Sequence, residues 1–215
     1  MFDPDVIHEI GLQSIGLPHA QMFDCIIGAL AERYPGQIDG TQPWIFSNAG
    51  GAMVQIKVLY ASASEYILLF GTPVGTGGHS GRHFVEFYDT VLDGEAWYYH
   101  EGQFTRDVYK TGDRIFVRKR QSAGMYIPDH VWMIEYARGV LPLSLPFGLA
   151  DSLLSTLDFT TVARTLAVYV SLTTRRVSKS QRAVLTGLAM SVLIVFVALR
   201  ILAGGKRKTA SQSRR

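Results

Sequence analysis

The sequence contains few cysteines, asparagines and charged residues, and each of these shortages excludes or indicates particular features. Its 215 residues include a single cysteine, Cys25, which excludes an intrachain disulfide and a cysteine-based zinc site. Its single asparagine, Asn48, is followed by Ala49 and Gly50, so there is no N-glycosylation sequon. Charged residues make up only 18% of the chain, less than the usual quarter of a soluble domain. This low share indicates that part of the surface faces something other than water.

The net charge is only +3, and the excess lies near the C-terminus. Basic clusters stand on both sides of an apolar segment, at Arg175, Arg176, Lys179 and Arg182 and at Lys206, Arg207, Lys208, Arg214 and Arg215. Such clusters fit the anionic headgroups of membrane lipids. A nucleic-acid-binding protein needs basic and aromatic residues shared across one folded face, and no such pattern is present. We therefore expect membrane lipids, and no nucleic acid, among the partners.

Residues 1–40 are predicted to form N-terminal helices. Apolar residues recur at helical spacing through residues 4–34, with a break at Pro18 and an end at Pro35 and Gly36. Cys25 falls within the second apolar stripe, so we expect it to be buried. The start, MFDPDVIHEI, carries acids and no basic region, which is not typical of a secretory signal.

Residues 41–139 have the composition of a β-barrel. Short runs rich in Val, Ile, Tyr, Phe and Trp alternate with glycine-containing segments, which is typical of a sandwich or barrel. The predicted strands are WIFSN, MVQIKVLY, EYILLF, RHFVEFYDTVL, AWYYH, DRIFVRK and VWMIEYARG. The predicted turns are Gly50-Gly51, Gly75 to Gly78, Asp93-Gly94 and Gly112-Asp113.

Beyond Gly139 the chain is predicted to be helical again. Residues 140–178 are apolar over much of the helical circumference, which indicates helices that are deeply buried or lie on a bilayer. Asp158 is expected to cap the second of them. Residues 183–205 contain one charge, Arg200, and are long enough for a transmembrane tail anchor, although a buried core helix has the same composition. Residues 206–215 form a basic tail.

Two carboxylates stand among the apolar residues of the predicted strands. Strand alternation places Asp89 on one face with Val85 and Phe87, and Glu135 on one face with Val131 and Met133. A carboxylate in apolar surroundings is costly unless it is paired, protonated or used in chemistry. If Asp89 and Glu135 meet, they can share one proton, which leaves one group neutral and the other ionised. The alternative is that each forms a structural salt bridge with an arginine such as Arg82 or Arg138.

The glycine-rich segment GTPVGTGGHSGR offers two further hypotheses, both weak. It lacks the Gly-Lys-Ser/Thr ending of a phosphate-binding loop, so a tight turn between strands is favoured. His79 and His83 are four residues apart, but no third histidine is clustered with them. We therefore expect no metal and no cofactor.

Several longer stretches together carry a resemblance to a known family. WIFSNAGGAM, ASASEYILLFGT, GGHSGRHFVEFYDT, WMIEYARG and PFGLADSLLSTLDF resemble, in order, the fungal C-8 sterol isomerase and sigma-1 receptor family. The resemblance runs from about residue 3 to about residue 176. The acids that follow the HSGR turn, Glu86 and Asp89, are similar to the receptor pattern, whereas IPDHVW and LPFGLADSLLSTLDF look more like the enzymes. Family members usually begin with a transmembrane helix, and the apolar segment of this chain stands at the other end.

The resemblance implies an α+β fold, in which a cupin-like β-barrel is flanked by N-terminal helices and by C-terminal helices that lie on the membrane. It implies an endoplasmic reticulum protein whose acidic pair, Asp89 and Glu135, lines a buried pocket. In the receptor branch the glutamate contacts the cationic amine of a ligand, and the aspartate supports it by a hydrogen bond. The other implied ligand contacts are Ile56, Val58, Tyr66, Leu68, Phe70, Phe87, Ile127, Leu145 and Tyr169.

The resemblance implies two functions that use this same pocket. One is a sterol isomerase that moves a ring double bond from Δ8 to Δ7, with Glu135 and Asp89 as acid and base. The other is a receptor-like regulatory membrane protein that binds sterols or amines without turnover. Oligomers are common in the receptor branch, so a homo-oligomer is a further expectation.

Overall fold

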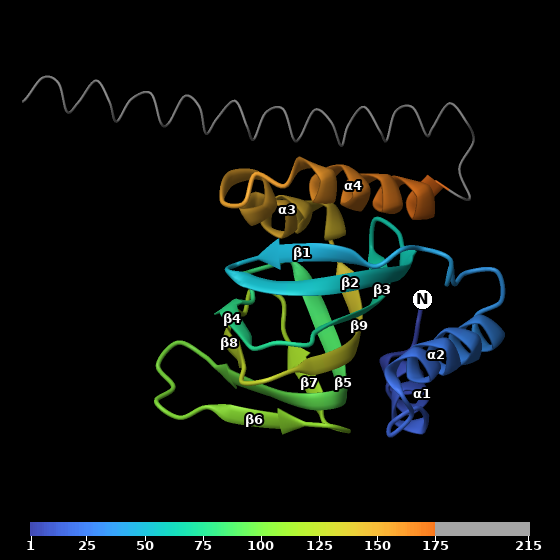
Figure 1. Ribbon diagram of the computed structural model, residues 1–215, viewed down its shortest axis with the longest axis horizontal. Coiled ribbons are helices and arrows are strands. Elements are labelled where there is room, and N and C mark those ends of the chain that lie inside the picture. Colours follow the sequence, from blue (N-terminus) through green and yellow to red (C-terminus); the bar gives the residue numbers. More distant parts are fainter. Residues whose placement is uncertain (175–215) are drawn as a thin grey trace, which may run out of the picture. The chain divides into compact units, whose positions relative to one another are not determined.

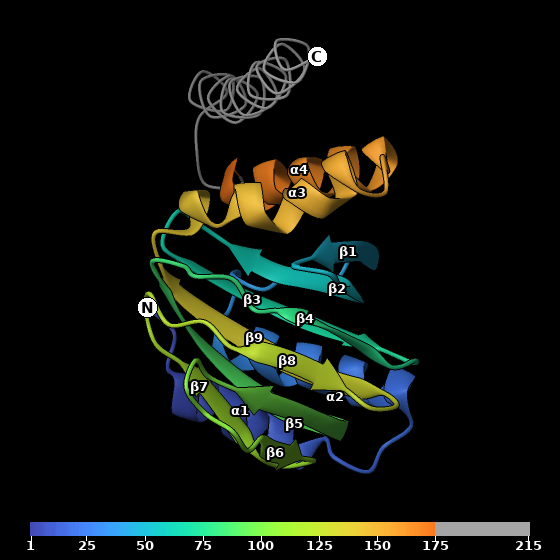
Figure 2. The same cartoon turned by 90° about the vertical axis from the view of Figure 1, so that its left-hand side faces the viewer.

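The structure is a computed structural model, and it describes residues 1–174. The predicted tail anchor at 183–205, the basic tail at 206–215 and the end of the 140–178 segment lie outside the described residues. Within the described residues, a nearly closed antiparallel β-barrel is flanked by two helices near the N-terminus and by a helical layer that follows the last strand (Figures 1 and 2). The prediction of a barrel with flanking helices is therefore confirmed.

The barrel is a nine-stranded sheet in which β1, β2, β3, β9, β5, β8 and β4 are neighbours in that order, with β6 and β7 also paired to β5. The strands are β1 (Ile45–Ala49), β2 (Ala52–Ala61), β3 (Glu65–Thr72), β4 (Thr76–His79), β5 (Val85–Tyr99), β6 (Asp107–Lys110), β7 (Arg114–Val117), β8 (Gly124–Ile127) and β9 (Val131–Gly139). The sheet nearly closes where β4 approaches the β1–β2 turn. There the amide of His79 donates to the carbonyl of Gly50 (2.9 Å), and the amide of Met53 donates to Oγ1 of Thr76 (3.0 Å).

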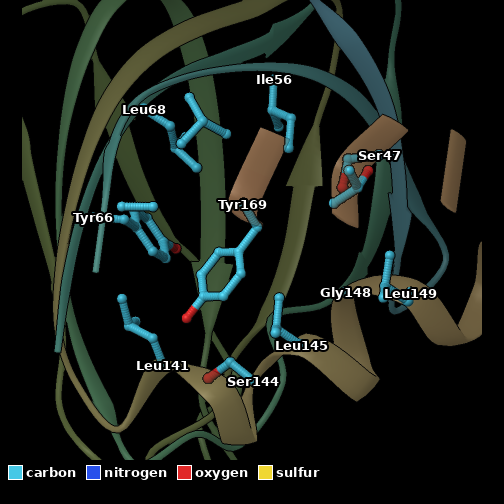
Figure 3. Close-up of a pocket in the computed structure, with 13 residues that line it drawn as sticks. Ser47, Ile56, Tyr66, Leu68, Leu141, Ser144, Leu145, Gly148, Leu149 and Tyr169 are labelled. Atoms are coloured by element: carbon cyan, nitrogen blue, oxygen red, sulfur yellow. The ribbon is translucent and has the colours of Figure 1, made fainter. Parts of the chain in front are cut away.

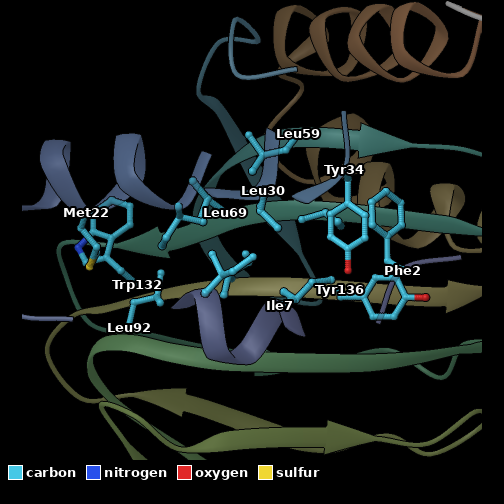
Figure 4. Packing of buried hydrophobic residues seen from close by; sticks show 14 residues of the cluster. Phe2, Ile7, Met22, Leu30, Tyr34, Leu59, Leu69, Leu92, Trp132 and Tyr136 are labelled. Carbon is cyan, nitrogen blue, oxygen red and sulfur yellow. The ribbon is translucent and has the colours of Figure 1, made fainter. Parts of the chain in front are cut away.

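Helices α1 (Pro4–Gln13) and α2 (His19–Arg33) cover the outer face of the sheet (Figure 4). Asp3 caps α1 by accepting the amide hydrogen of Asp5 (2.9 Å). Gly11 lets α1 approach closely, because a Cβ there would lie only 3.2 to 3.3 Å from side chains of β5 and β9. The cluster between helices and sheet includes Ile7, Met22, Ile26, Leu30, Leu59, Ile67, Leu69, Leu92, Trp132, Ile134 and Tyr136. Burial of this cluster is the main stabilising contribution of the outer face.

The inner face of the sheet forms a second apolar cluster. Because side chains alternate along a strand, the immediate neighbours of the residues that contact the helices point inward. The inward cluster comprises Leu68, Phe70, Val91, Ala96, Tyr98, Ile115, Val117, Ala123, Ile127, Val131 and Met133. The two clusters therefore lie on opposite faces of the same strands.

The helical layer after β9 comprises a short 3-10 turn, η1 (Leu141–Leu143), and the helices α3 (Leu145–Leu154) and α4 (Phe159–Thr174). As predicted, Asp158 caps α4, since its carboxylate accepts the amide hydrogen of Thr161 (2.9 Å). Val168 and Leu172 of α4 pack in a cluster with Ile45 and Ala61 of the barrel. No helix within residues 1–174 has both the length and the apolar character needed to cross a membrane.

Three local predictions are wrong. Asp93 and Gly94 do not form a turn. They lie inside the continuous strand β5 at a register irregularity, where Gly94 has a φ of +89° and a Cβ would lie 2.2 Å from the carbonyl oxygen of His130. The segment from Gly75 to Gly78 contains most of strand β4, because glycine lets it approach the β1–β2 turn. Cys25 is exposed, because it lies on the side of α2 away from Met22, Ile26 and Leu30.

Candidate functional site

The sheet places the two candidate acids directly opposite each other. In the β5–β9 ladder Asp89 is paired with Glu135, and the irregularity near Gly94 leaves this part of the register intact. Both side chains belong to the inward-facing set, because Phe87 and Val91 flank Asp89 at spacings of two, and Met133 precedes Glu135 by two. Asp89 is only 3% exposed. The barrel therefore brings together two carboxyl groups that are 46 residues apart in the sequence.

The arginines proposed as salt-bridge partners lie elsewhere. Nε of Arg138 donates to Glu86 (2.8 Å), which is on the outer face of β5, and Nη2 of Arg82 donates to Glu101 (3.1 Å). Among the described residues no lysine or arginine lines the cavity that contains Asp89 and Glu135. The alternative in which each acid forms a salt bridge with Arg82 or Arg138 is therefore not what the structure shows.

Without a cation, the pair is stabilised by retaining a proton. Burial raises the pKa of Asp89 well above its usual range, and the neighbouring Glu135 charge raises it further. Burial also raises the pKa of Glu135, but hydrogen bonds from Tyr66 and Asp89 oppose that rise. Both pKa values are raised, so the pair retains a proton, and a hydrogen bond joins the two carboxyl groups. Oδ1 of Asp89 is buried with no hydrogen-bond partner among the described residues.

Tyr66 is the second donor to the glutamate. Its hydroxyl lies 2.5 Å from Oε1 of Glu135 and donates to it. Burial, together with the Glu135 charge, raises the pKa of Tyr66 well above its usual value, so the phenol stays protonated. Tyr98 lines the same cavity, and its pKa is raised by burial and by the charges of both acids. The polar groups around the pair are thus neutral donors.

The acids line an inner cavity of about 210 Å³ within the barrel. A second, outer cavity of about 160 Å³ lies between the barrel and helices α3 and α4 (Figure 3). Ser47, Ile56 and Leu68 line both, so the two cavities adjoin. Tyr66 lines the outer cavity while its hydroxyl bonds Glu135 in the inner one. The outer cavity therefore borders the inner cavity that contains the acids.

Most of the predicted ligand contacts line one of these cavities. Phe70 and Phe87 line the inner cavity with the two acids, Val58, Tyr66, Leu145 and Tyr169 line the outer one, and Ile56 and Leu68 line both. Ile127 is the exception. It is fully buried in the inward cluster of the barrel, paired with Thr76 of β4, and lines neither cavity.

Sequence reasoning missed further residues that line the cavities. In the inner cavity they include Ser47, His79, Ser80, His83, Tyr98, Val117, Met125 and Phe147, and in the outer one Ala61, Leu141, Ser144, Gly148, Leu149 and Thr165. Counting back from Asp89 in steps of two gives Phe87, Val85 and His83, so alternation offered a signal for the histidine. No comparable signal identified Phe147 or Ser144, because their position depends on how α3 packs on the barrel.

The two histidines of the glycine-rich segment hydrogen-bond within their own turn. Nδ1 of His79 accepts the amide hydrogen of Gly81 (2.9 Å), and Nε2 of His83 lies 3.2 Å from the carbonyl oxygen of Ser80. Burial lowers the pKa of His83, which favours the neutral ring. Within residues 1–174 no group of three or more His, Cys, Asp or Glu side chains is arranged to hold a metal ion.

Fold and site together define a cupin-like β-barrel with flanking helices, in which a largely apolar cavity contains a buried carboxyl pair. The family model described as "ERG2 and Sigma1 receptor like protein" matches residues 1–180, and the chain belongs to this family. This confirms the resemblance seen in the sequence.

Named relatives come from both branches. The chain is 42% identical over 170 residues to sigma non-opioid intracellular receptor 1 of Gallus gallus, covering 78% of this chain and 77% of the relative. It is 37% identical over 174 residues to the C-8 sterol isomerase of Pyricularia oryzae, covering 78% of each. An RmlC-like cupin from Shewanella frigidimarina, 18% identical, covers 48% of this chain and 94% of the cupin with a TM-score of 0.39. Because that score is low, the assignment of a barrel depends on the strand pairing described above and not on this similarity.

Proposed function

We propose that the protein is a sterol Δ8–Δ7 isomerase that uses the carboxyl pair Asp89 and Glu135 for proton transfer. The observation that supports this most is the pair itself, which combines a protonated carboxyl and a carboxylate at the end of an apolar cavity. An acid and a base held side by side in a low dielectric are what a double-bond shift requires. The family includes a C-8 sterol isomerase, and this agrees with the proposal.

The proposed reaction conserves protons. The proton on the pair adds to C9 of the C8=C9 double bond, which leaves a cation at C8. The carboxylate then removes a proton from C7, and the electron pair of that C–H bond forms the C7=C8 double bond. The pair ends with the one proton that it began with, and the hydrogen bond between Asp89 and Glu135 returns that proton to its starting position. The aromatic rings of Tyr66, Phe70 and Phe87, which line the two cavities, lie where they can stabilise the cation.

A second function is favoured by a specific observation. The pair carries one negative charge in an apolar cavity, and this suits a cationic amine as well as a carbocation. Relatives from Gallus gallus and Danio rerio, 42% and 40% identical, are sigma non-opioid intracellular receptors. The second candidate is therefore a receptor-like membrane protein that binds sterols or amines without turnover.

We further propose that the protein acts at the endoplasmic reticulum membrane, with lipids and second copies of the chain as its partners. Supporting this, large apolar side chains are exposed in and beside the helical layer: Val140, Leu143, Leu154, Leu157 and Phe159. Exposed apolar side chains grouped on one layer are typical of a surface that contacts lipid or protein.

One experiment separates the two functions. The full chain is expressed in a yeast strain that lacks its own sterol isomerase, and the sterols are analysed by mass spectrometry. The isomerase proposal expects Δ8 sterols to fall and Δ7 sterols to appear. Persisting Δ8 sterols in cells that contain the protein in the correct membrane would contradict catalysis and leave the receptor-like function. Binding of a radiolabelled amine by the same membranes checks that the site is folded.

A further inference from the structure

The outer cavity contains one buried hydroxyl that the protein leaves without a partner. Oγ of Ser144 is buried and makes no hydrogen bond within the described residues. It lines the cavity beside Leu141 and Leu145, in surroundings that are otherwise largely apolar (Figure 3). A buried hydroxyl without a partner costs free energy, so its presence in a ligand cavity suggests that a ligand supplies the missing bond.

The local backbone explains why this hydroxyl is free. Ser144 occupies the N-cap position of α3, where a serine side chain usually accepts an amide hydrogen of the first turn. Pro146 at the second helical position has no amide hydrogen to give. The backbone of Ser144 is also helical (φ −88°, ψ −20°) rather than extended, and its side chain makes no capping bond. The hydroxyl is thus not used by the helix that it precedes.

Several other polar groups around the two cavities already have hydrogen-bond partners. In the outer cavity Thr165 donates to the carbonyl of Thr161 (2.9 Å), and Tyr169 donates to the carbonyl of Ser62 (3.2 Å). In the inner cavity Oγ of Ser80 accepts the amide hydrogen of Ala123 (2.8 Å), and His83 is bonded to its own turn. Of the described side chains that line the outer cavity, Ser144 is the one with a buried hydroxyl that makes no hydrogen bond.

We propose that Ser144 is the specificity-determining residue that binds the hydroxyl of a sterol in the outer cavity. This inference rests on the proposed function for the identity of the ligand. A sterol has one hydroxyl at one end of a rigid, apolar ring system, so a single hydrogen bond decides which end enters first. With its hydroxyl at Ser144 beside α3, the ring system extends past Tyr66 toward Glu135 and Asp89. The opposite orientation would leave Ser144 without a partner and would place the sterol hydroxyl at the carboxyl pair instead of the ring system.

The test compares two sterols in the purified full-length protein. Affinities of a 3-hydroxy Δ8 sterol and of its 3-deoxy analogue are measured for the wild type and for Ser144→Ala. We expect the wild type to prefer the hydroxy sterol about tenfold, as one neutral hydrogen bond predicts, and Ser144→Ala to lose that preference. Ser144→Thr keeps a hydroxyl and should keep the preference. The control is Ser155→Ala, an exposed serine at the other end of α3, which should behave as the wild type.

Thermal stability without ligand distinguishes binding from a structural role. Removing a buried hydroxyl that has no partner should leave the melting temperature of Ser144→Ala equal to that of the wild type or higher. A lower melting temperature, or an unchanged preference for the hydroxy sterol, would overturn the assignment of Ser144 while sterol binding stands. A wild-type protein that binds neither sterol would overturn the proposed sterol function, and the assignment with it.

Discussion

The carboxylates on the two faces of strands β5 and β9 differ in their hydrogen-bond and ion-pair partners. On the outer face Glu86 pairs with Arg138 (2.8 Å), and Glu65 of the adjacent β3 accepts hydrogen bonds from Tyr136 (2.6 Å) and from the amide of Phe2 (3.1 Å). On the inner face, Asp89 and Glu135 form hydrogen bonds only with each other and with Tyr66 among residues 1–174. Neighbouring positions of the same strands thus carry satisfied acids on one side and a cation-free pair on the other.

This difference separates the residues that stabilise the fold from those that are candidates for chemistry. The outer face combines a large apolar cluster with polar groups that have partners, which is what a stable interface of helices on a sheet requires. The inner face retains a costly arrangement of like groups beside a cavity, and proteins retain such costs mainly at functional sites. Substitutions on the two faces should therefore change different quantities, and the following predictions test this from the largest expected effect to the smallest.

Glu135→Gln should give the largest functional effect. It removes the ionised member of the pair, so isomerisation should fall by about a thousandfold, as for the loss of a general acid or base. The melting temperature should stay the same or rise, because a buried charge is removed. Isomerase assays and thermal unfolding of the purified protein measure the two quantities. Glu86→Gln is the matched control on the outer face, and isomerisation that survives in Glu135→Gln would remove this glutamate from the mechanism.

Ile26→Ala should give the largest effect on stability. Ile26 is fully buried between α2 and the sheet, and its truncation should lower the free energy of unfolding by about 2 to 4 kcal/mol through lost burial and a cavity. Amine affinity of the remaining folded protein should be unchanged. Denaturant unfolding and ligand titration check this pair of outcomes. A large loss of affinity in the folded variant would show that the two faces are not separable.

Asp89→Asn should stabilise the protein at neutral pH. The pKa of Asp89 is raised in the folded state above its ordinary value of 3.8, so between these values the folded state holds a proton that the unfolded state releases. Stability therefore falls as pH rises above about 4, and the asparagine variant avoids this loss. We expect the free energy of unfolding of the variant to exceed that of the wild type by about 1 kcal/mol at pH 7. This difference should disappear below pH 4. Thermal unfolding across pH measures it, and a variant less stable than the wild type at pH 7 argues against a protonated Asp89.

Tyr66→Phe should shift the pH dependence of amine binding. The Tyr66 hydroxyl lowers the pKa of Glu135 by donating to it, so its removal lets that pKa rise. Because a cationic amine needs the ionised carboxylate, the acidic limb of binding should move to higher pH. At neutral pH we expect about tenfold weaker binding, the size of one charge-assisted hydrogen bond. An unshifted profile would mean that this bond does not control ionisation of the glutamate.

Glu86→Gln should have the smallest effect. Arg138 holds the pKa of Glu86 below its ordinary value of 4.5, so the ion pair contributes stability above that value and loses it as pH falls through the lowered pKa. The pair is partly exposed, and we expect a loss of at most about 1 kcal/mol at pH 7. Unfolding at pH 7 and at pH 3 gives the comparison, in which the difference should shrink at the lower pH. Ligand affinity should not change.

Much of the barrel could be predicted from the sequence, because the relevant physics is local. Period-two alternation puts Asp89 and Glu86 on opposite faces of one strand, and the structure has them so. The helix break at Pro18 and the cap at Asp158 follow from backbone chemistry that residues carry with them. The glycines misled where their role depends on a distant partner. A side chain at Gly94 or Gly78 would collide with the backbone of His130 or Gly50. Neither of these close contacts can be read from the local sequence.

The candidate site divides in the same way. The sequence by itself determined that two acids lie in apolar strands, and the family motifs indicated that they share a pocket. Only the tertiary structure decided that Arg138 and Arg82 bind other partners, that burial raises the pKa of both acids, and that α3 and α4 enclose an outer cavity lined by Ser144. The reason is that side-chain direction along a strand is a local property. Partners, burial and the pKa values that follow from them depend on packing between residues far apart in the chain.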